Sequence, residues 1–193
     1  MNTIIYKITF LSYWAVGSGK GGGLAADNLV LKEKGLPIIP GKTLKGLIRQ
    51  VYREVDPENI IRLFGHEKKT NDNEKSLPNK LGKFHFGSAR LPENLRLDLI
   101  GNHALQRELY HSRTSTAIET GTKQALENSL RKMEVCVPLT LNAEIEIQDD
   151  SNFDLEFFKK ALKGVRHLGE KRYRGLGRCH LEFIQLKTEK ANV

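Results

Sequence analysis

The chain has few cysteines and no long apolar run. Cys136 and Cys179, its two cysteines, lack CxxC spacing and any metal-ligand spacing to a histidine, which favours two small buried hydrophobic residues over a metal site. No stretch approaches the roughly 20 apolar residues that span a bilayer. The N-terminal sequence MNTIIYKITF has no basic region followed by an apolar run and a cleavage site. We therefore expect a cytoplasmic protein with no membrane partner.

Positive charge is in clear excess. The 193 residues carry a formal net charge of +8, with 39% hydrophobic and 28% charged residues, which is an ordinary composition for a globular protein. That length favours one domain over residues 1–193. Lysine and arginine gain free energy by displacing counterions from phosphates, so the balance indicates an anionic partner such as a nucleic acid.

Hydrophobic periodicity predicts strand, helix, strand, strand, helix and strand, in that order. Thr43 is the expected N-cap of the first helix, and residues 28–31 form an additional short extended piece. This order is typical of an α+β fold with a ferredoxin-like, RRM-like βαββαβ antiparallel sheet, whose open face or end loops commonly bind RNA. The predicted strands cover residues 4–12, 82–91, 133–147 and 178–186, and the predicted helices cover residues 44–54 and 153–168.

Segments without periodicity separate these elements. Residues 17–23 form a glycine-rich loop, and the polar residues 66–80 are expected to form a flexible loop. Residues 102–131 are too long for a simple turn, so we interpret them as an insertion, and insertions of this size usually carry function.

Basic residues gather beside glycines, which favours phosphate binding. The segment from Pro40 to Gly46 combines lysines and a hydroxyl with a helix N-terminus, where backbone N–H groups attract anions. It lacks the GxxxxGK[ST] spacing of a nucleotide-binding P-loop, so an RNA backbone is the better candidate ligand. The segment from Gly169 to Arg178 lets a backbone approach closely and adds more arginine. The candidate RNA-binding residues from these glycine-rich regions are Lys20, Lys42, Thr43, Lys45, Arg49, Lys171, Arg172, Arg174 and Arg178.

Asp27 is the candidate catalytic residue. It follows the glycine loop, where a carboxylate beside bound RNA could hold a divalent metal ion such as Mg²⁺ or orient an attacking 2′-OH. A turn residue is the alternative interpretation. His103 or His111 could act as a general acid or base, although solvated or packed histidines are commoner. The spacing of histidines and carboxylates predicts no set of metal-ligating residues.

Three segments together resemble the RAMP superfamily of CRISPR-associated proteins. They read Gly22 to Val30 with its Asp27-Asn28-Leu29-Val30 strand, Ile39-Pro40-Gly41-Lys42-Thr43-Leu44-Lys45-Gly46, and Gly169 to Arg178. Arg113-Thr114-Ser115-Thr116 and Thr120-Gly121-Thr122-Lys123 are similar to the family's thumb region, which adds Arg113 and Lys123 to the candidate RNA-binding residues. The resemblance covers nearly the whole chain.

The resemblance implies a repeated backbone subunit of a type III CRISPR effector complex, active in antiviral defence. Such a subunit binds a CRISPR guide RNA and its complementary target RNA, beside neighbouring copies of itself and other effector subunits. Residues 102–131 would be the thumb that pushes through the guide–target duplex. The aspartate corresponding to Asp27 is the metal-dependent endoribonuclease residue in type III members. The alternatives are a catalytically inert structural subunit and a CRISPR RNA-processing endoribonuclease that depends on histidine and uses no metal.

Overall fold

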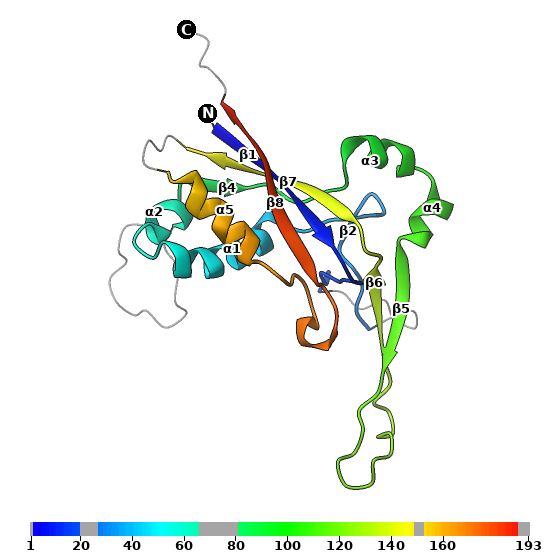
Figure 1. Ribbon diagram of the computed structural model, residues 1–193. Helices are drawn as coiled ribbons and strands as arrows, with labels where there is room; N and C mark the ends of the chain where they lie inside the picture. The colour runs from blue at the N-terminus through cyan, green and yellow to red at the C-terminus, as the bar shows by residue number, and fades with distance from the viewer. Residues whose placement is uncertain (1, 20–26, 66–80, 149–152, 189–193) are drawn as a thin grey trace.

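The computed structural model describes residues 2–19, 27–65, 81–148 and 153–188, and Figure 1 shows the arrangement of the elements. Residues 66–80, expected to be a flexible loop, and most of the glycine-rich loop, including Lys20, lie outside the described residues. The strands are β1 (Asn2–Phe10), β2 (Lys32–Glu33), β3 (Leu36–Pro37), β4 (Phe84–Phe86), β5 (Tyr110–Ser115), β6 (Arg131–Cys136), β7 (Thr140–Ile147) and β8 (Cys179–Thr188). The helices are α1 (Gly41–Val55), α2 (Ile60–Phe64), α3 (Glu93–Leu99), α4 (His103–Glu108), α5 (Leu155–Gly164) and the 3₁₀ turn η1 (Arg172–Arg174).

A four-stranded antiparallel sheet in the order β4-β7-β1-β8 forms the body of the molecule. Strand β1 lies in the middle, and its side chains alternate between buried and half-buried because one face packs on the core. The combination of helices with an antiparallel sheet, predicted from the sequence as an α+β fold, is therefore confirmed.

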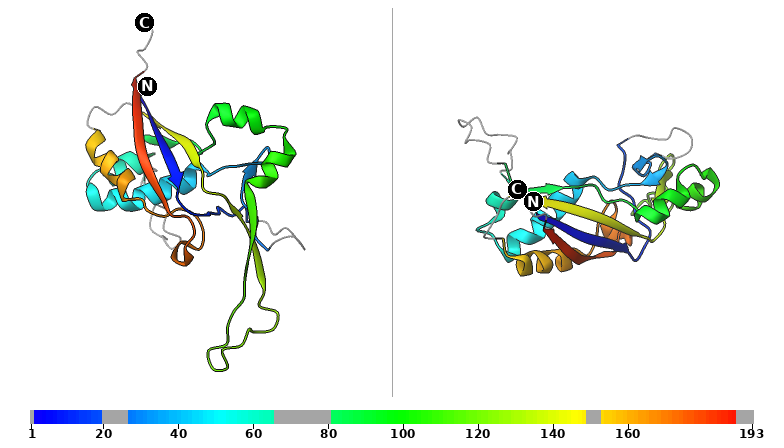
Figure 2. Two further views of the ribbon diagram at one scale, coloured as in Figure 1. Left: turned by 45° about the vertical axis from the view of Figure 1, so that its right-hand side comes forward. Right: turned by 90° about the horizontal axis from the view of Figure 1, so that it is seen from above.

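Helices α1 and α5 lie together on one side of this sheet (Figures 1 and 2). Leu44, Ile48 and Tyr52 recur every fourth residue of α1 and are fully buried, which places one stripe of the helix against the sheet. The helix begins at Gly41, before the expected residue 44. The prediction of Thr43 as the N-cap was wrong, since Pro40 is the N-cap. The Pro40 carbonyl accepts hydrogen bonds from the N–H groups of Thr43 and Leu44, so Thr43 already belongs to the first turn.

The predicted strand over residues 133–147 is divided into β6 and β7. Pro138 lies between them and has no N–H with which to continue a ladder. Before the break, Cys136 exchanges backbone hydrogen bonds with Trp14, at 2.7 and 3.1 Å. After it, β7 pairs with β1 along its whole length. The prediction of one strand was wrong because alternation alone does not reveal which neighbour each half pairs with.

Other predicted elements also differ from the structure. Strand β4 is shorter than the expected 82–91, and α3 and α4 were not predicted, because each is too short to establish a helical period. Helix α5 lies within the expected 153–168, and Asp154 caps it by accepting hydrogen bonds from the N–H groups of Glu156 and Phe157.

A hairpin of β5 and β6 projects from the body, with residues 116–130 at its far end (Figures 1 and 2). It occupies most of the segment interpreted as an insertion. At its base, Glu134 accepts hydrogen bonds from the Val30 N–H (3.0 Å) and from Lys32 Nζ (2.7 Å). Asn28 also forms a parallel bridge with Met133, so the residues after the glycine loop are fixed to the hairpin.

Candidate nucleic-acid interface

The first turn of α1 is held against the sheet by a close backbone contact. A Cβ atom at Gly41 would lie 2.0 Å from the Phe86 carbonyl oxygen, so only glycine allows this approach. Lys42 and Thr43 follow and are exposed, and the first turn contains no acidic residue. The N-terminal end of this helix therefore presents positive charge and helix-dipole potential to the same side.

The segment between α5 and β8 folds back on the residues that follow β1. Its Leu168 and Gly177 are joined by a backbone hydrogen bond of 2.8 Å, and Gly177 N–H donates to the Tyr13 carbonyl at 2.8 Å. Glu170 N–H donates to the Ala15 carbonyl, also at 2.8 Å. A Cβ at Gly177, which has φ +70°, would lie 2.0 Å from the Leu168 oxygen. We call residues 165–178 the basic loop.

The α1 N-terminus and the basic loop line one hollow of about 550 Å³. Lys42 and Arg172 supply positive charge to it, and both are exposed. These residues are far apart in the sequence, and the fold brings them to one place. The hollow is lined by Val16, Gly17, Lys42, Thr43, Gly46, Leu47, Gln50, Leu168, Gly169, Glu170 and Arg172.

A second hollow of about 400 Å³ contains the candidate catalytic residue. Asp27 and Asn28 line it together with residues from the base of the hairpin and from the basic loop. It shares Glu170 with the first hollow, so the two are neighbours. The remaining lining residues are Gly19, Ser115, Arg131, Lys132, Met133 and Lys171.

Asp27 is exposed and fixed by the backbone of β6. Its N–H donates to the Lys132 carbonyl at 2.8 Å, and the Lys132 N–H donates to its Oδ2 at 2.7 Å. The other carboxylate oxygen, Oδ1, has no hydrogen bond to the described residues. The carboxylate is therefore held in one position in the lining of this hollow.

Asn28 and Glu170 bridge the two hollows. Asn28 Nδ2 donates to Glu170 Oε2 at 2.6 Å. A Cβ at Gly17 would lie 2.1 Å from Glu170 Oε1, so the pair packs directly on this glycine. The Asp27 segment is thus tied on one side to the hairpin and on the other to the basic loop.

A third hollow of about 230 Å³ continues from the first along α1. It shares Leu47, Gln50 and Arg172 with the first hollow. Val51, Gly164, Val165, Arg166, His167 and Tyr173 complete its lining. We call the three hollows together the groove.

The other predicted RNA-binding residues lie outside the groove lining. Lys45 is half-buried, and its pKa is lowered by desolvation and, to a smaller extent, by the neighbouring charge of Arg49. Arg174 and Arg178 are exposed elsewhere on the basic loop. Arg113 lies on β5, and Lys123 lies in the loop at the far end of the hairpin with φ +57°. The structure therefore brings together Lys42, Thr43, Lys171 and Arg172, and leaves the rest around them or apart.

The open face of the sheet differs in charge from the groove. Glu144 and Glu146 of β7 are exposed there, and Glu182 of β8 forms an ion pair of 2.9 Å with Lys7. The hydrogen bond from Lys7, together with its charge, holds the pKa of Glu182 below its usual range. Of the two RNA-binding locations expected from the fold, the loops at the end of the sheet suit a polyanion better.

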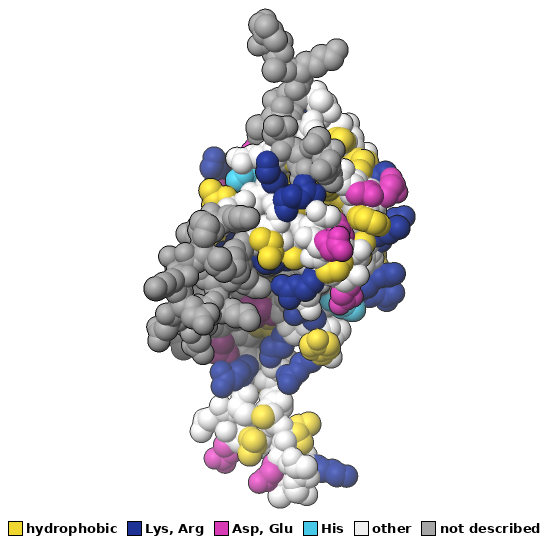
Figure 3. Space-filling view, turned by 90° about the vertical axis from the view of Figure 1, so that its left-hand side faces the viewer, with side chains coloured by type: hydrophobic (Ala, Val, Ile, Leu, Met, Phe, Trp, Pro, Cys, Tyr) yellow, Lys and Arg dark blue, Asp and Glu magenta, His cyan; other side chains and the backbone are white. Residues whose placement is uncertain are grey.

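Figure 3 shows dark blue lysine and arginine side chains where the narrow projection joins the body.

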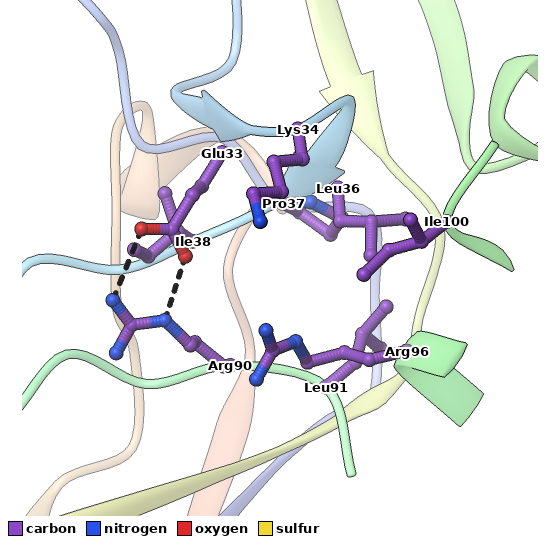
Figure 4. A pocket seen from close by; sticks show the side chains of 9 residues that line it. All are labelled: Glu33, Lys34, Leu36, Pro37, Ile38, Arg90, Leu91, Arg96 and Ile100. Atoms are coloured by element: carbon purple, nitrogen blue, oxygen red, sulfur yellow. Dashed lines mark hydrogen bonds and ion pairs between the residues drawn. The ribbon is translucent and has the colours of Figure 1, made fainter. Parts of the chain in front are cut away.

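The small cavity in Figure 4, by contrast, does not suit a ligand. It measures about 10 Å³, which is at the limit for a single water molecule. Arg90 closes it through two hydrogen bonds to Glu33, at 2.7 and 3.1 Å.

Residues that the sequence did not single out also line the groove. Glu170 and Tyr173 lie within a segment chosen for its glycines and arginines, whereas Gln50 and His167 carried no signal of their own. Arg131 and Lys132 reach the groove only because β6 returns to its base. His103 and His111 do not line it, and His111 instead packs edge-on against Tyr13 at 5.5 Å.

The described residues contain no cluster of three or more histidine, cysteine or carboxylate side chains that could hold a metal ion. Mg²⁺ commonly binds to proteins through only one or two carboxylates and takes its other ligands from water and substrate phosphates. Asp27 and Glu170 line the same hollow and fit that more limited role.

Both cysteines are buried, which raises the pKa of each thiol to about 12 and keeps it protonated. The described helices include none long and apolar enough to span a membrane.

Comparisons with known proteins concern the family and the fold of this chain. A family model described as the RAMP superfamily matches residues 7–180. The protein "CRISPR system Cms endoribonuclease Csm3" of Streptococcus thermophilus is 27% identical over 181 residues, with 85% of this chain and 78% of that protein covered.

Two solved structures share the fold. One is described as the type III-B Cmr-beta complex bound to cognate target RNA, and its matching chain has a TM-score of 0.70 at 14% identity, with 94% of this chain and 96% of that chain covered. The other is the apo state of type III-B Cmr-beta, with a TM-score of 0.69 at 15% identity and coverage of 95% and 97%. At these identities the likeness concerns the fold.

Proposed function

The chain belongs to the RAMP superfamily, and from this premise we propose that it is an RNA-binding backbone subunit of a type III CRISPR effector complex. Its ligands are a CRISPR guide RNA and the complementary target RNA. Its protein partners are further copies of itself and other effector subunits. The relative named Csm3 and the fold shared with Cmr-beta chains support this proposal.

One observation carries the proposal. Lys42 at the start of α1, Arg172 in the basic loop and Asp27 after the glycine loop all line the neighbouring hollows of one groove. A flexible polyanion needs positive charge along a path rather than at a point, and such a path is what the groove provides. Exposed arginine next to closely packed glycine suits phosphate recognition in particular.

We further assign the sheet to the ferredoxin-like βαββαβ class. Its elements follow along the chain as β1, α1, β4, β7, α5 and β8, and its strand order β4-β7-β1-β8 supports this assignment. The β5–β6 hairpin is then the thumb. Two exposed apolar side chains beyond its strands, Ile118 (66% exposed) and Leu130 (68%), suit insertion between bases, as apolar wedges do in other nucleic-acid-binding proteins.

We also propose that Asp27 cleaves the target RNA. Asp27 lines a hollow that also contains Arg131, Lys132 and Lys171, which can hold the scissile phosphate. A divalent cation would supply Lewis-acid stabilisation of the phosphoryl charge there. The hydrogen bond from Lys132 N–H to Oδ2 keeps the carboxylate oriented and exposed.

The test is cleavage of a labelled RNA complementary to the guide by the assembled complex, in Mg²⁺ or in EDTA. Asp27→Asn is the informative variant, because its amide oxygen can still accept the hydrogen bond from Lys132 N–H while the negative charge is lost. We expect regularly spaced cuts in Mg²⁺, and no cuts in EDTA or with Asp27→Asn.

A structural role for Asp27 is the second candidate. Its paired hydrogen bonds with the Lys132 backbone are what an anchoring residue would form. In that case the Asp27→Asn variant and the wild type would show the same cleavage, or the same lack of it. Asp27→Ala would instead loosen the hairpin base and weaken RNA binding.

A further inference from the structure

Tyr173 is the most exposed large hydrophobic side chain among the described residues. Its exposed fraction is 99%, and it makes no hydrogen bond or ring contact with the described part of the chain. An aromatic ring of this size left wholly in water contributes nothing to the core. Its position therefore suggests a ligand that uses the face of the ring.

The backbone holds Tyr173 in a defined turn. Tyr173 is the middle residue of η1, which is closed by a hydrogen bond of 2.8 Å from Arg174 N–H to the Lys171 carbonyl. Lys171 (φ +53°) and Gly175 (φ +79°) are left-handed on either side and make the turn tight. A short turn between two such residues loses little conformational entropy when a ligand binds to it.

The hollow beside Tyr173 has the composition that a flat heterocycle requires. Leu47, Val51 and Val165 provide apolar walls. Exposed Gln50 and His167 lie on the same lining and can form hydrogen bonds with ring edges. Its volume of about 230 Å³ limits it to one such group.

Charge decides between a nucleic acid and a protein partner. Tyr173 is flanked in sequence by Arg172 and Arg174, with Lys171 one residue further. Arg172 lines both this hollow and the neighbouring one that contains Lys42. A ligand that places a planar ring beside closely spaced negative charges is a nucleotide.

We propose that this hollow takes one nucleobase of the bound RNA, stacked on Tyr173, while Arg172 holds an adjacent phosphate. The inference rests on the proposed RNA-binding function and adds to it a contact with a base. Stacking accepts any base, so the contact serves to fix the RNA in register rather than to read its sequence.

The experiment measures binding of the full-length chain to two single-stranded 12-mers, oligoadenylate and an abasic ribose-phosphate chain of equal length. Tyr173→Leu removes the aromatic face and Tyr173→Phe keeps it. We expect Tyr173→Leu to weaken oligoadenylate binding about 10-fold, within the range for loss of one stacked base. Tyr173→Phe should bind oligoadenylate like the wild type, and all three proteins should bind the abasic chain equally. Because the side chain is exposed, thermal unfolding should be the same for all three proteins.

Several results would overturn the inference. An equal loss on both oligonucleotides, or no loss on either, would mean that Tyr173 does not stack on a base. A Leu variant that binds RNA normally but no longer assembles with other copies would assign the ring to a protein contact. Wild-type protein that bound neither oligonucleotide would instead refute the RNA-binding function itself, so the two failures are distinguishable.

Discussion

Replacing Arg172 with alanine removes one cation from the middle of the groove without disturbing the fold, because its side chain is exposed. A hydrogen bond to a charged group contributes about 1.5–3 kcal/mol when well shielded from water, and an exposed one less. We therefore expect a loss of about 1 kcal/mol, or roughly fivefold in affinity, at low salt.

The salt dependence is the more specific prediction. Each phosphate contact on a single strand adds about 0.7 to the slope of log affinity against log salt. Loss of one contact should reduce that slope by about 0.7, so the difference between wild type and Arg172→Ala should shrink about 2.5-fold between 50 and 200 mM salt. Fluorescence anisotropy of a labelled single-stranded RNA measures both quantities.

Lys187 provides the matched control, since it carries the same charge and is also exposed. It lies near the far end of β8, about 25 Å from Cys179 at the usual rise of a strand. That distance exceeds the Debye length of about 10 Å at 0.1 M salt, so Lys187→Ala should leave the slope unchanged. Equal effects of the two substitutions would refute the argument, because they would mean that only net charge matters.

The same reasoning yields further predictions. Lys45→Ala should weaken RNA binding and flatten its salt dependence less than Arg172→Ala, because Lys45 is half-buried and outside the groove lining; anisotropy titrations measure this. Gly177→Ala should lower the melting temperature much more than Gly175→Ala, since both have positive φ but only a Cβ at Gly177 collides with backbone, at 2.0 Å from the Leu168 oxygen. Tyr6→Phe should leave the free energy of unfolding unchanged or raise it by about 1 kcal/mol in urea titrations, because the buried Tyr6 hydroxyl has no hydrogen-bond partner in the described residues.

Much of the fold follows from local patterns. The alternation in β1 and the four-residue spacing in α1 each arise from one face packing on the core, so they predict the element correctly. The division of the expected strand 133–147 at Pro138 could not be predicted from local patterns. It depends on tertiary pairing, since β6 pairs with β5 and β7 pairs with β1. Short α3 and α4 gave too few turns for a period to be recognised.

The groove was less predictable than the fold. Glycine and lysine or arginine in the same short segment indicated Lys42 and Arg172 because their surroundings in the sequence are distinctive. The shared hollow that joins them is a tertiary feature. The hydrogen bond between Asn28 and Glu170 is another, since these residues are separated by 142 positions in the sequence. No local sequence pattern predicts a long-range contact of that kind.

The most direct test of the account asks which surface touches RNA. Guide RNA that contains 4-thiouridine is crosslinked to the full-length chain in the assembled complex, and the crosslinked peptides are identified by mass spectrometry. The account predicts crosslinks to the groove-lining residues of two segments, 42–51 of α1 and 166–173 of the basic loop. Crosslinks confined to the open face of the sheet, around Glu144 and Glu182, would contradict it.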